Sequence, residues 1–444
     1  MALGPRGVRL NGLRPVSRDR RPASVLASAL LLAAGCSLLP SSAPGPTATA
    51  PPEEPTALQR VVFVGPDFSV GTALRDGSER RTLAAPGAGG DGVRTALGYT
   101  WPTWSPDGRQ VAVSRTPGPA RGDIASLVVL DADGSNERFV HVTNDGQVNF
   151  VADGAPHYAH WSPDGRRLSF VAPRSDGTGL GLFETAVDDA DPHLVAQDAP
   201  LYHTWSPDSS GILLHRREQL LVHSVADRST QAIGRNSGSY RVPAYSRRGT
   251  WMAYAADIGA GEQLIAWSPQ TGAERELWAL DGGVAFAWSP REDVLAATQR
   301  VDDFSPGTDG LVLFDVTAAE RRRIFDGSVL SFFWSPDGSR IAIASPGPSA
   351  GSFEWLVVDV DTGRATTVTS FVPTSDYLTF LQFFDQYAPS HLVWSADSRY
   401  LAFAGTIPED EDRAQAWVVD VTGAEEPLAV AAGRLTFWVP PLVP

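Results

Sequence analysis

The chain has 444 residues, of which 43% are hydrophobic and 20% are charged. That balance is typical of a folded globular protein and argues against a disordered chain. The formal net charge is −15. Because an acidic surface repels phosphate backbones, we expect no nucleic-acid partner. The single cysteine excludes an intramolecular disulfide bond and a zinc site built from cysteines.

The first 35 residues have the features of an export signal. Six arginines and a single acid, Asp19, come before a short apolar run at residues 23–34, a pattern typical of secretory signals. The run ends in Leu32-Ala-Ala-Gly-Cys36, which resembles the lipobox of bacterial lipoproteins. The resemblance implies cleavage before Cys36 and lipidation of its thiol. We therefore expect a protein anchored to the membrane outside the cytoplasm, in the periplasm or at the cell surface.

Residues 36–57 follow the predicted cleavage point and consist mainly of Pro, Ala, Ser and Thr. A segment of this composition cannot bury a hydrophobic core, so it predicts a disordered tether that begins at the lipidated Cys36. The folded body is accordingly expected at residues 58–444.

A short phrase, Trp-Ser-Pro-Asp-Gly or a close variant, recurs along the body. The copies begin at Trp104, Trp161, Trp205, Trp288, Trp334 and Trp394, with a weaker copy at Tyr245. An apolar strand leads into each copy, the Pro-Asp-Gly portion favours a tight turn, and further strands follow. Their spacing of about 40 to 60 residues is that of four-stranded propeller blades. The sequence therefore predicts an all-β chain folded as a single β-propeller.

The two ends of the body complement each other. Residues 60–83 predict a blade that lacks its first strand, whereas residues 434–438 predict a first strand with nothing after it. We expect the C-terminal strand to join the N-terminal blade and close the ring. This arrangement predicts eight blades. Seven blades remain the alternative, because the copy at Tyr245 is degenerate.

The repeated phrases resemble those of TolB-type propellers, distant relatives of WD repeats, over the whole of residues 58–444. The resemblance implies a module that binds an envelope protein, a glycan or another envelope polymer. It implies no catalytic residues, no cofactor and no metal, and we expect a monomer.

First strands line the central channel of a propeller, so the residues just before each phrase are expected at the channel mouth. Four of the eight histidines fall in this column, which includes His160. Imidazole, phenol and guanidinium groups there would suit an anionic ligand, a sugar or a metal. The alternative is that they pack between blades or fill the channel. The candidate binding residues are Tyr99, Trp101, His157, Tyr158, Tyr202, His203, Arg241, His391 and Arg434.

Two catalytic alternatives come from related propellers. Oligogalacturonate lyases are similar in fold and hold a metal with channel-mouth histidines, which would here be His157, His203 and His391 and would imply a metal-dependent polysaccharide lyase. Propellers also accompany serine hydrolases, and Gly347-Pro-Ser-Ala-Gly351 matches Gly-x-Ser-x-Gly. That motif needs a strand before it and a helix after it, whereas the pattern here predicts a hairpin loop.

An aromatic-rich insertion at residues 371–390 precedes the last phrase. It predicts a cap over the channel, a docking surface, or a segment packed on its own blade.

Overall fold

A computed structural model describes residues 59–88, 95–117, 125–142, 157–174, 179–189, 191–198, 201–238, 242–300, 310–408 and 410–441. The chain divides into two units, and every described residue belongs to the second unit, residues 53–444. The predicted signal peptide, Cys36 and the predicted tether lie outside the described residues. No helix in the described ranges is long and apolar enough to cross a membrane.

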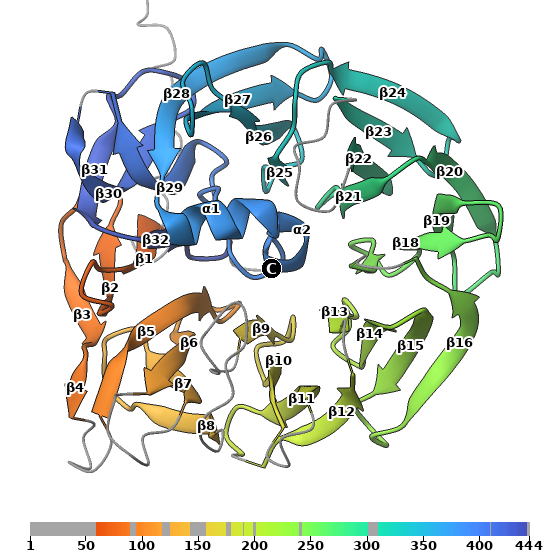
Figure 1. The fold of residues 1–444 in the computed structure, drawn as a ribbon, viewed down its shortest axis with the longest axis horizontal. Coiled ribbons are helices and arrows are strands. Elements are labelled where there is room, and N and C mark those ends of the chain that lie inside the picture. The colour runs from red at the N-terminus through yellow and green to blue at the C-terminus, as the bar shows by residue number, and fades with distance from the viewer. Residues whose placement is uncertain are drawn as a thin grey trace, which may run out of the picture. The chain divides into compact units, whose positions relative to one another are not determined.

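The second unit is a ring of antiparallel blades around a central axis (Figure 1). In blades 2 to 7 the strands follow one another in chain order from the centre outward. Blade 2 has β5 (Thr95–Trp104), β6 (Gln110–Pro117), β7 (Ser126–Asp131) and β8 (Arg138–Val142), with the short β4 (Gly87–Ala88) beside β5. Blade 3 has β9 (His157–Trp161), β10 (Arg167–Pro173), β11 (Leu180–Ala186) and β12 (His193–Gln197). Blade 4 has β13 (Leu201–Trp205), β14 (Gly211–Arg216), β15 (Gln219–Ser224) and β16 (Thr230–Asn236).

Blades 5 to 7 repeat this order on the other side of the ring. Blade 5 has β17 (Ala244–Tyr245), β18 (Met252–Asp257), β19 (Glu262–Trp267) and β20 (Glu274–Leu280), so the degenerate copy at Tyr245 does begin a blade. Blade 6 has β21 (Gly283–Trp288), β22 (Val294–Arg300), β23 (Leu311–Asp315) and β24 (Glu320–Phe325). Blade 7 has β25 (Ser331–Trp334), β26 (Arg340–Pro346), β27 (Phe353–Asp359) and β28 (Ala365–Pro373). The Gly-x-Ser-x-Gly motif connects β26 to β27, as the hairpin prediction requires.

Blade 8 departs from the pattern at its centre. Its strands are β29 (Tyr400–Ile407), β30 (Asp410–Asp420) and β31 (Leu428–Ala432). Residues 392–394 take the innermost position through isolated bridges from Trp394 to Leu401 and from Leu392 to Trp438. The end of β28 pairs with β29, so blades 7 and 8 share one seven-stranded sheet.

Blade 1 joins the two ends of the body. Its strands are β32 (Leu435–Trp438), β1 (Arg60–Val64), β2 (Val70–Leu74) and β3 (Arg81–Ala84). The register pairs Val61 with Trp438 and Val64 with Leu435. The predicted closure by the C-terminal strand is confirmed, and the described strands make up the eight predicted blades.

Among the described residues, the tryptophan of the repeated phrase ties five of the blades to the blade before them. The indole N–H of Trp161 donates to the carbonyl oxygen of Thr103 at 3.1 Å, and that of Trp394 donates to Phe333 at 2.9 Å. Trp205, Trp288 and Trp334 donate in the same way to His160, Ala244 and Ala287. Each acceptor directly precedes the phrase of the preceding blade. In blades 1 and 2 the indole N–H groups of Trp438 and Trp104 have no acceptor among the described residues.

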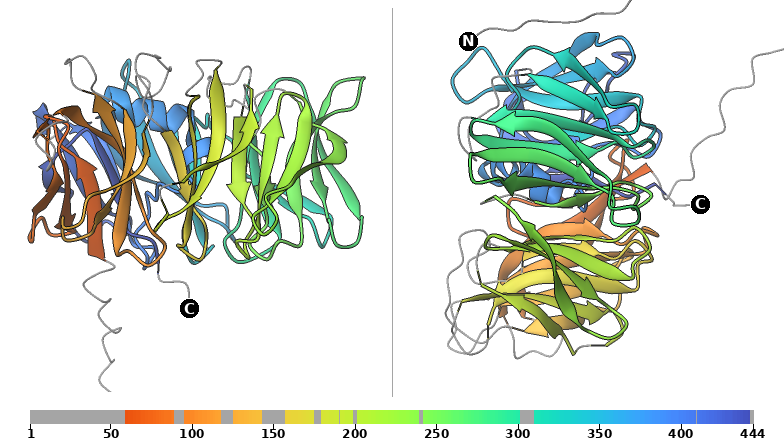
Figure 2. Two further views of the ribbon diagram at one scale, coloured as in Figure 1. Left: turned by 90° about the horizontal axis from the view of Figure 1, so that it is seen from below. Right: turned by 90° about the vertical axis from the view of Figure 1, so that its right-hand side faces the viewer.

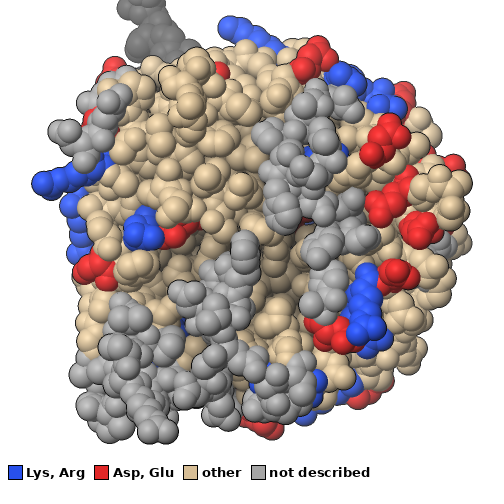
Figure 3. Space-filling view, in the orientation of Figure 1, with Lys and Arg blue, Asp and Glu red and all other residues tan. Residues whose placement is uncertain are grey.

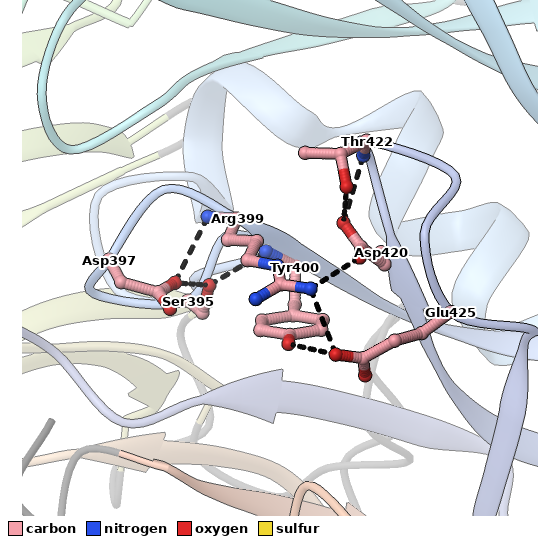
Figure 4. Close-up of polar contacts among 7 residues, drawn as sticks. All are labelled: Ser395, Asp397, Arg399, Tyr400, Asp420, Thr422 and Glu425. Carbon is pink, nitrogen blue, oxygen red and sulfur yellow. Dashed lines mark hydrogen bonds and ion pairs between the residues drawn. The ribbon is translucent and has the colours of Figure 1, made fainter. Parts of the chain in front are cut away.

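The serine and aspartate of the phrase brace its turn. In blade 8 the hydroxyl of Ser395 donates to Asp397 and accepts from the backbone N–H of Tyr400 at 2.8 Å (Figure 4). The same Ser–Asp bond measures 2.6 Å at Ser105, Ser162, Ser206 and Ser335. These five turns therefore share one geometry and lie on one face of the ring, which we call the turn face.

A polar network at the junction of blades 8 and 1 surrounds Tyr400 (Figure 4). Arg399 donates to Asp420 at 2.7 Å and to Glu425 at 2.8 Å. The guanidinium carbons of Arg399 and of Arg75, which belongs to blade 1, lie 5.0 and 4.6 Å from the centre of the Tyr400 ring. Burial acts to raise the pKa of Asp420, but bonds from Arg399 and Thr422 outweigh it and lower that pKa. These contacts hold the junction where Trp438 makes no indole bond to a described residue.

Candidate functional site: a plugged channel and a depression on the turn face

The aromatic insertion forms two short helices that extend from blade 8 to the centre of the ring (Figure 1). They are α1 (Ser375–Gln382) and α2 (Phe384–Tyr387), and they lie toward the face opposite the turn face (Figure 2). Residues 375–390, here called the channel plug, replace the long innermost strand that blade 8 lacks. Of the three roles predicted for this insertion, capping the channel agrees with its position.

The sequence of the plug explains its shape. The side chain of Thr374 caps α1 by accepting the backbone N–H of Tyr377 at 3.1 Å. Asp376 lies in the first turn, where the helix dipole favours a negative charge, and accepts from Arg434 at 2.7 Å. The apolar face is fully buried and consists of Tyr377, Phe380, Leu381, Phe384 and Tyr387.

The neighbouring blades 7 and 8 hold this apolar face. Phe380 stacks on Phe333 of blade 7 with ring centroids 5.5 Å apart, and Phe384 packs edge-on against Phe332 at 4.9 Å. The hydroxyl of Tyr377 donates to the carbonyl oxygen of Ala402 in blade 8 at 3.1 Å. Around the plug, the described part of this surface is largely uncharged over α1 and blade 7, whereas charges gather over blades 4 to 6 (Figure 3).

Several predicted channel-mouth residues meet beneath the plug. Trp101 stacks on Tyr387 with centroids 4.5 Å apart and planes 16° apart. Tyr158 lies 5.7 Å from Tyr387 and 4.4 Å from the ring of His203, and its hydroxyl donates to the carbonyl oxygen of His203 at 2.9 Å. His391 lies 5.4 Å from Tyr387. These side chains pack on the plug and leave little surface exposed.

Other predicted residues lie elsewhere. The hydroxyl of Tyr99 donates to Glu137 at 3.3 Å, and the ring of Tyr202 lies 6.0 Å from that of His215. Arg434 pairs with Asp376 at the start of the plug and covers the ring of Phe68 at 4.4 Å. Arg241 lies outside the described residues.

His160 and Tyr387 are central polar residues that the nine candidate binding residues do not include. The Nε2 atom of His160 lies 3.1 Å from the carbonyl oxygen of Gln386 in the plug. Its signal in the sequence was its place directly before Trp161, in the same column as the predicted residues. Tyr387 gave no such signal, because it belongs to an insertion and not to a repeat.

Burial keeps the imidazoles around the plug uncharged. It lowers the pKa of His160 to about 4 and that of His391 to about 3. Burial also lowers the pKa of His203, and the neighbouring His160 and His157 act in the same direction. The Nε2 atom of His203 lies 2.8 Å from the hydroxyl of Ser169. Within the described residues no three His, Cys, Asp or Glu side chains are grouped so as to hold a metal, including His157, His203 and His391.

The opposite end of the channel opens as a depression of about 490 Å³ on the turn face. Its walls are the tryptophans and prolines of the phrases in blades 2, 3 and 4, together with Pro440 of blade 1. His160 contributes to it from β9, and Pro389 and Ser390 contribute from the end of the plug. The charged side chains that line it are Asp164, Asp208 and Arg247. Hydrogen bonds from Ser206 and Ser210 lower the pKa of Asp208, so this carboxylate carries its charge at neutral pH.

These features define the class of protein as an eight-bladed β-propeller with a helical plug in its channel. No model of a known protein family matches the sequence, and no curated protein matches it. Solved structures do match. The chain is similar to the dihydro-heme d1 dehydrogenase NirN, with 17% identity over 89% of this chain and 79% of that chain and a TM-score of 0.55.

A structure of a eukaryotic initiation factor matches with 14% identity over 86% of this chain and 99% of that chain, at a TM-score of 0.52. TolB from Acinetobacter baumannii matches with 13% identity over 70% of this chain and 63% of that chain, at a TM-score of 0.37. At such identities the likeness concerns the fold alone. The β-propeller predicted from the TolB-type repeats is confirmed.

Proposed function

We propose that this protein is a lipid-anchored, extracytoplasmic propeller that binds an envelope protein or polymer at the turn-face depression and performs no catalysis. The observation that carries the proposal is the asymmetry of the channel. One end is filled by the plug, and the other end is a concave, mostly apolar depression with a few charged side chains at its wall. Such sites are the usual places where proteins bind ligands.

Charge indicates the chemistry of the partner. Asp164 and Asp208 outnumber Arg247 in the depression, and the whole chain carries a net charge of −15. A partner segment with apolar side chains and a basic group would complement both the walls and the charge. Of the two partner classes, this favours an envelope protein over an acidic glycan.

Site-specific photo-cross-linking tests the proposal. A benzoylphenylalanine placed at Arg247 in the depression should form a defined adduct in intact cells, whereas one placed at Arg321 on the outer strand β24 serves as the matched control. Mass spectrometry then identifies the adduct. Adducts of equal yield at both positions, or none at Arg247, would contradict the proposal.

A second arm separates binding from catalysis. Full-length protein incubated with Mn²⁺ and oligogalacturonate should leave the substrate intact. Formation of unsaturated product that disappears in a His203→Gln variant would instead support the lyase alternative.

A further inference from the structure

Two residues that pack against Tyr387, the last residue of α2 in the plug, have an unfavourable backbone conformation. Trp101 and Tyr158 both have φ of +54°, and both stand three positions before the tryptophan of their phrase. In both blades the pairing of the first strand is irregular at this point. Large side chains rarely adopt positive φ, and such strain persists where the surrounding structure enforces it. Here it turns both rings toward Tyr387.

The Tyr387 side chain itself is held by ring packing and not by a bond from its hydroxyl group. The Tyr387 side chain is fully buried, and its hydroxyl has no hydrogen-bond partner among the described residues. A buried hydroxyl without a partner is unfavourable, because it has given up its bonds to water. Withdrawal of the plug would relieve this cost together with the strain at Trp101 and Tyr158.

Three buried imidazoles make the packing between the plug and the blades sensitive to pH. His160 contacts the backbone of the plug, His391 follows directly after it, and His203 packs on Tyr158. All three side chains are almost fully buried. Burial disfavours the charged form, so each remains neutral while the plug is in place. Exposure to water would return each pKa toward its ordinary value.

We propose that the channel plug is a gate that opens in acid. Withdrawal would lift residues 375–390 from the channel. It would connect the face opposite the turn face with the turn-face depression, to which Pro389 and Ser390 contribute. The inference concerns the plug alone and stands whether or not a partner binds in the depression.

The expected size of the effect follows from proton linkage. An imidazole whose pKa rises on opening from about 4 to about 6.5 shifts the open-to-closed ratio about 30-fold at pH 5 relative to pH 7.5. The direction is fixed, because the open state binds more protons, so falling pH favours it. His160 and His391 together give about 900-fold if both become exposed.

Other charged groups also face the plug and influence how its opening depends on pH. Asp376 of α1 pairs with Arg434, and Arg300 of β22 donates to the carbonyl oxygen of Gln382 at 3.5 Å and covers Phe384. Asp385 of α2 lies near enough to Tyr158 to affect its ionisation. His157, on the same strand as His160, acts on His203. Exposure of His203, which the calculation for His160 and His391 leaves out, would add to the shift.

Hydrogen exchange of the full-length protein tests the gate. Exchange is followed by mass spectrometry at pH 7.5 and pH 5.0, with rates corrected for the intrinsic pH dependence of amide exchange. We expect the protection of residues 375–391 to fall at least 30-fold at pH 5.0 while β14 and β22 keep theirs. Unchanged protection of the plug overturns the proposal. So does a loss shared equally with β14 and β22, since that is unfolding of the ring.

Matched variants identify the titrating group. His160→Gln keeps an N–H that can donate to Gln386 but cannot gain a proton, so it should reduce the pH response about 30-fold. His193→Gln, on the outer strand β12, is the control and should leave the response unchanged. If His160→Gln does not fold, His391→Gln takes its place. A full response in a folded variant of either buried histidine would exclude that histidine, and a full response in both would overturn the gate.

Discussion

Two tyrosines of the plug should respond in opposite ways to the loss of a hydroxyl group. Tyr377 and Tyr387 are both fully buried, on neighbouring helices of one segment. The hydroxyl of Tyr377 donates to Ala402 at 3.1 Å, whereas that of Tyr387 has no partner among the described residues. Tyr→Phe leaves the ring in place at both positions. The pair therefore isolates the hydroxyl group.

The magnitudes follow from the cost of burying a polar group. Removing a satisfied buried hydroxyl costs about 1 kcal/mol of stability, so Tyr377→Phe should destabilise the protein by that amount. Removing an unsatisfied one recovers its desolvation penalty, so Tyr387→Phe should stabilise the protein by roughly 1–3 kcal/mol. The difference between the variants is therefore at least about 2 kcal/mol.

Urea denaturation followed by circular dichroism measures both values, because a shift of the midpoint at constant slope reports stability alone. Hydrogen exchange of residues 375–391 in the same samples shows whether the change is local to the plug. Destabilisation of equal size in both variants would refute the reasoning, since it would mean that the Tyr387 hydroxyl is satisfied.

Two further predictions concern the ring and the anchor. Trp394→Phe should destabilise the protein by about 1 kcal/mol more than Trp438→Phe in urea denaturation. The reason is that the indole N–H of Trp394 donates to the carbonyl oxygen of Phe333, whereas that of Trp438 has no acceptor among the described residues. Equal losses of stability would show that the bond between blades contributes nothing. In a detergent phase partition, Cys36→Ser should move the protein from the detergent-rich phase to the aqueous phase, because the proposed acyl chains would be missing. An unchanged distribution would contradict lipid anchoring.

The repeats were sufficient to predict the blades because each copy encodes a local structure. Trp161 and Trp394 mark the same hydrogen bond at different places in the ring, and the Ser–Asp pair marks the same turn. The closure was predictable for a related reason. Residues 60–83 and 434–438 are incomplete in complementary ways, and a blade with an unpaired inner edge needs a partner strand.

The interior of the channel could not be predicted in the same way. The sequence placed His157, His203 and His391 in one column, but His391 is buried against the plug, which no repeat encodes. The aromatic residues of the insertion indicated that it packs on something. Whether they would cover the channel or their own blade depends on the reach of two short helices, and that is a property of the folded ring.

Blade 1, which closes the ring, also determines where the predicted tether joins the propeller. Val439, just after β32, donates its backbone N–H to the carbonyl oxygen of Arg60 at 3.1 Å, so β1 begins on the turn face beside Pro440. If Cys36 is held in a membrane, any pull between anchor and partner enters the ring at Arg60. The strand that receives it is clamped on both sides, by β2 and by β32, and the load is shared by two ladders of hydrogen bonds.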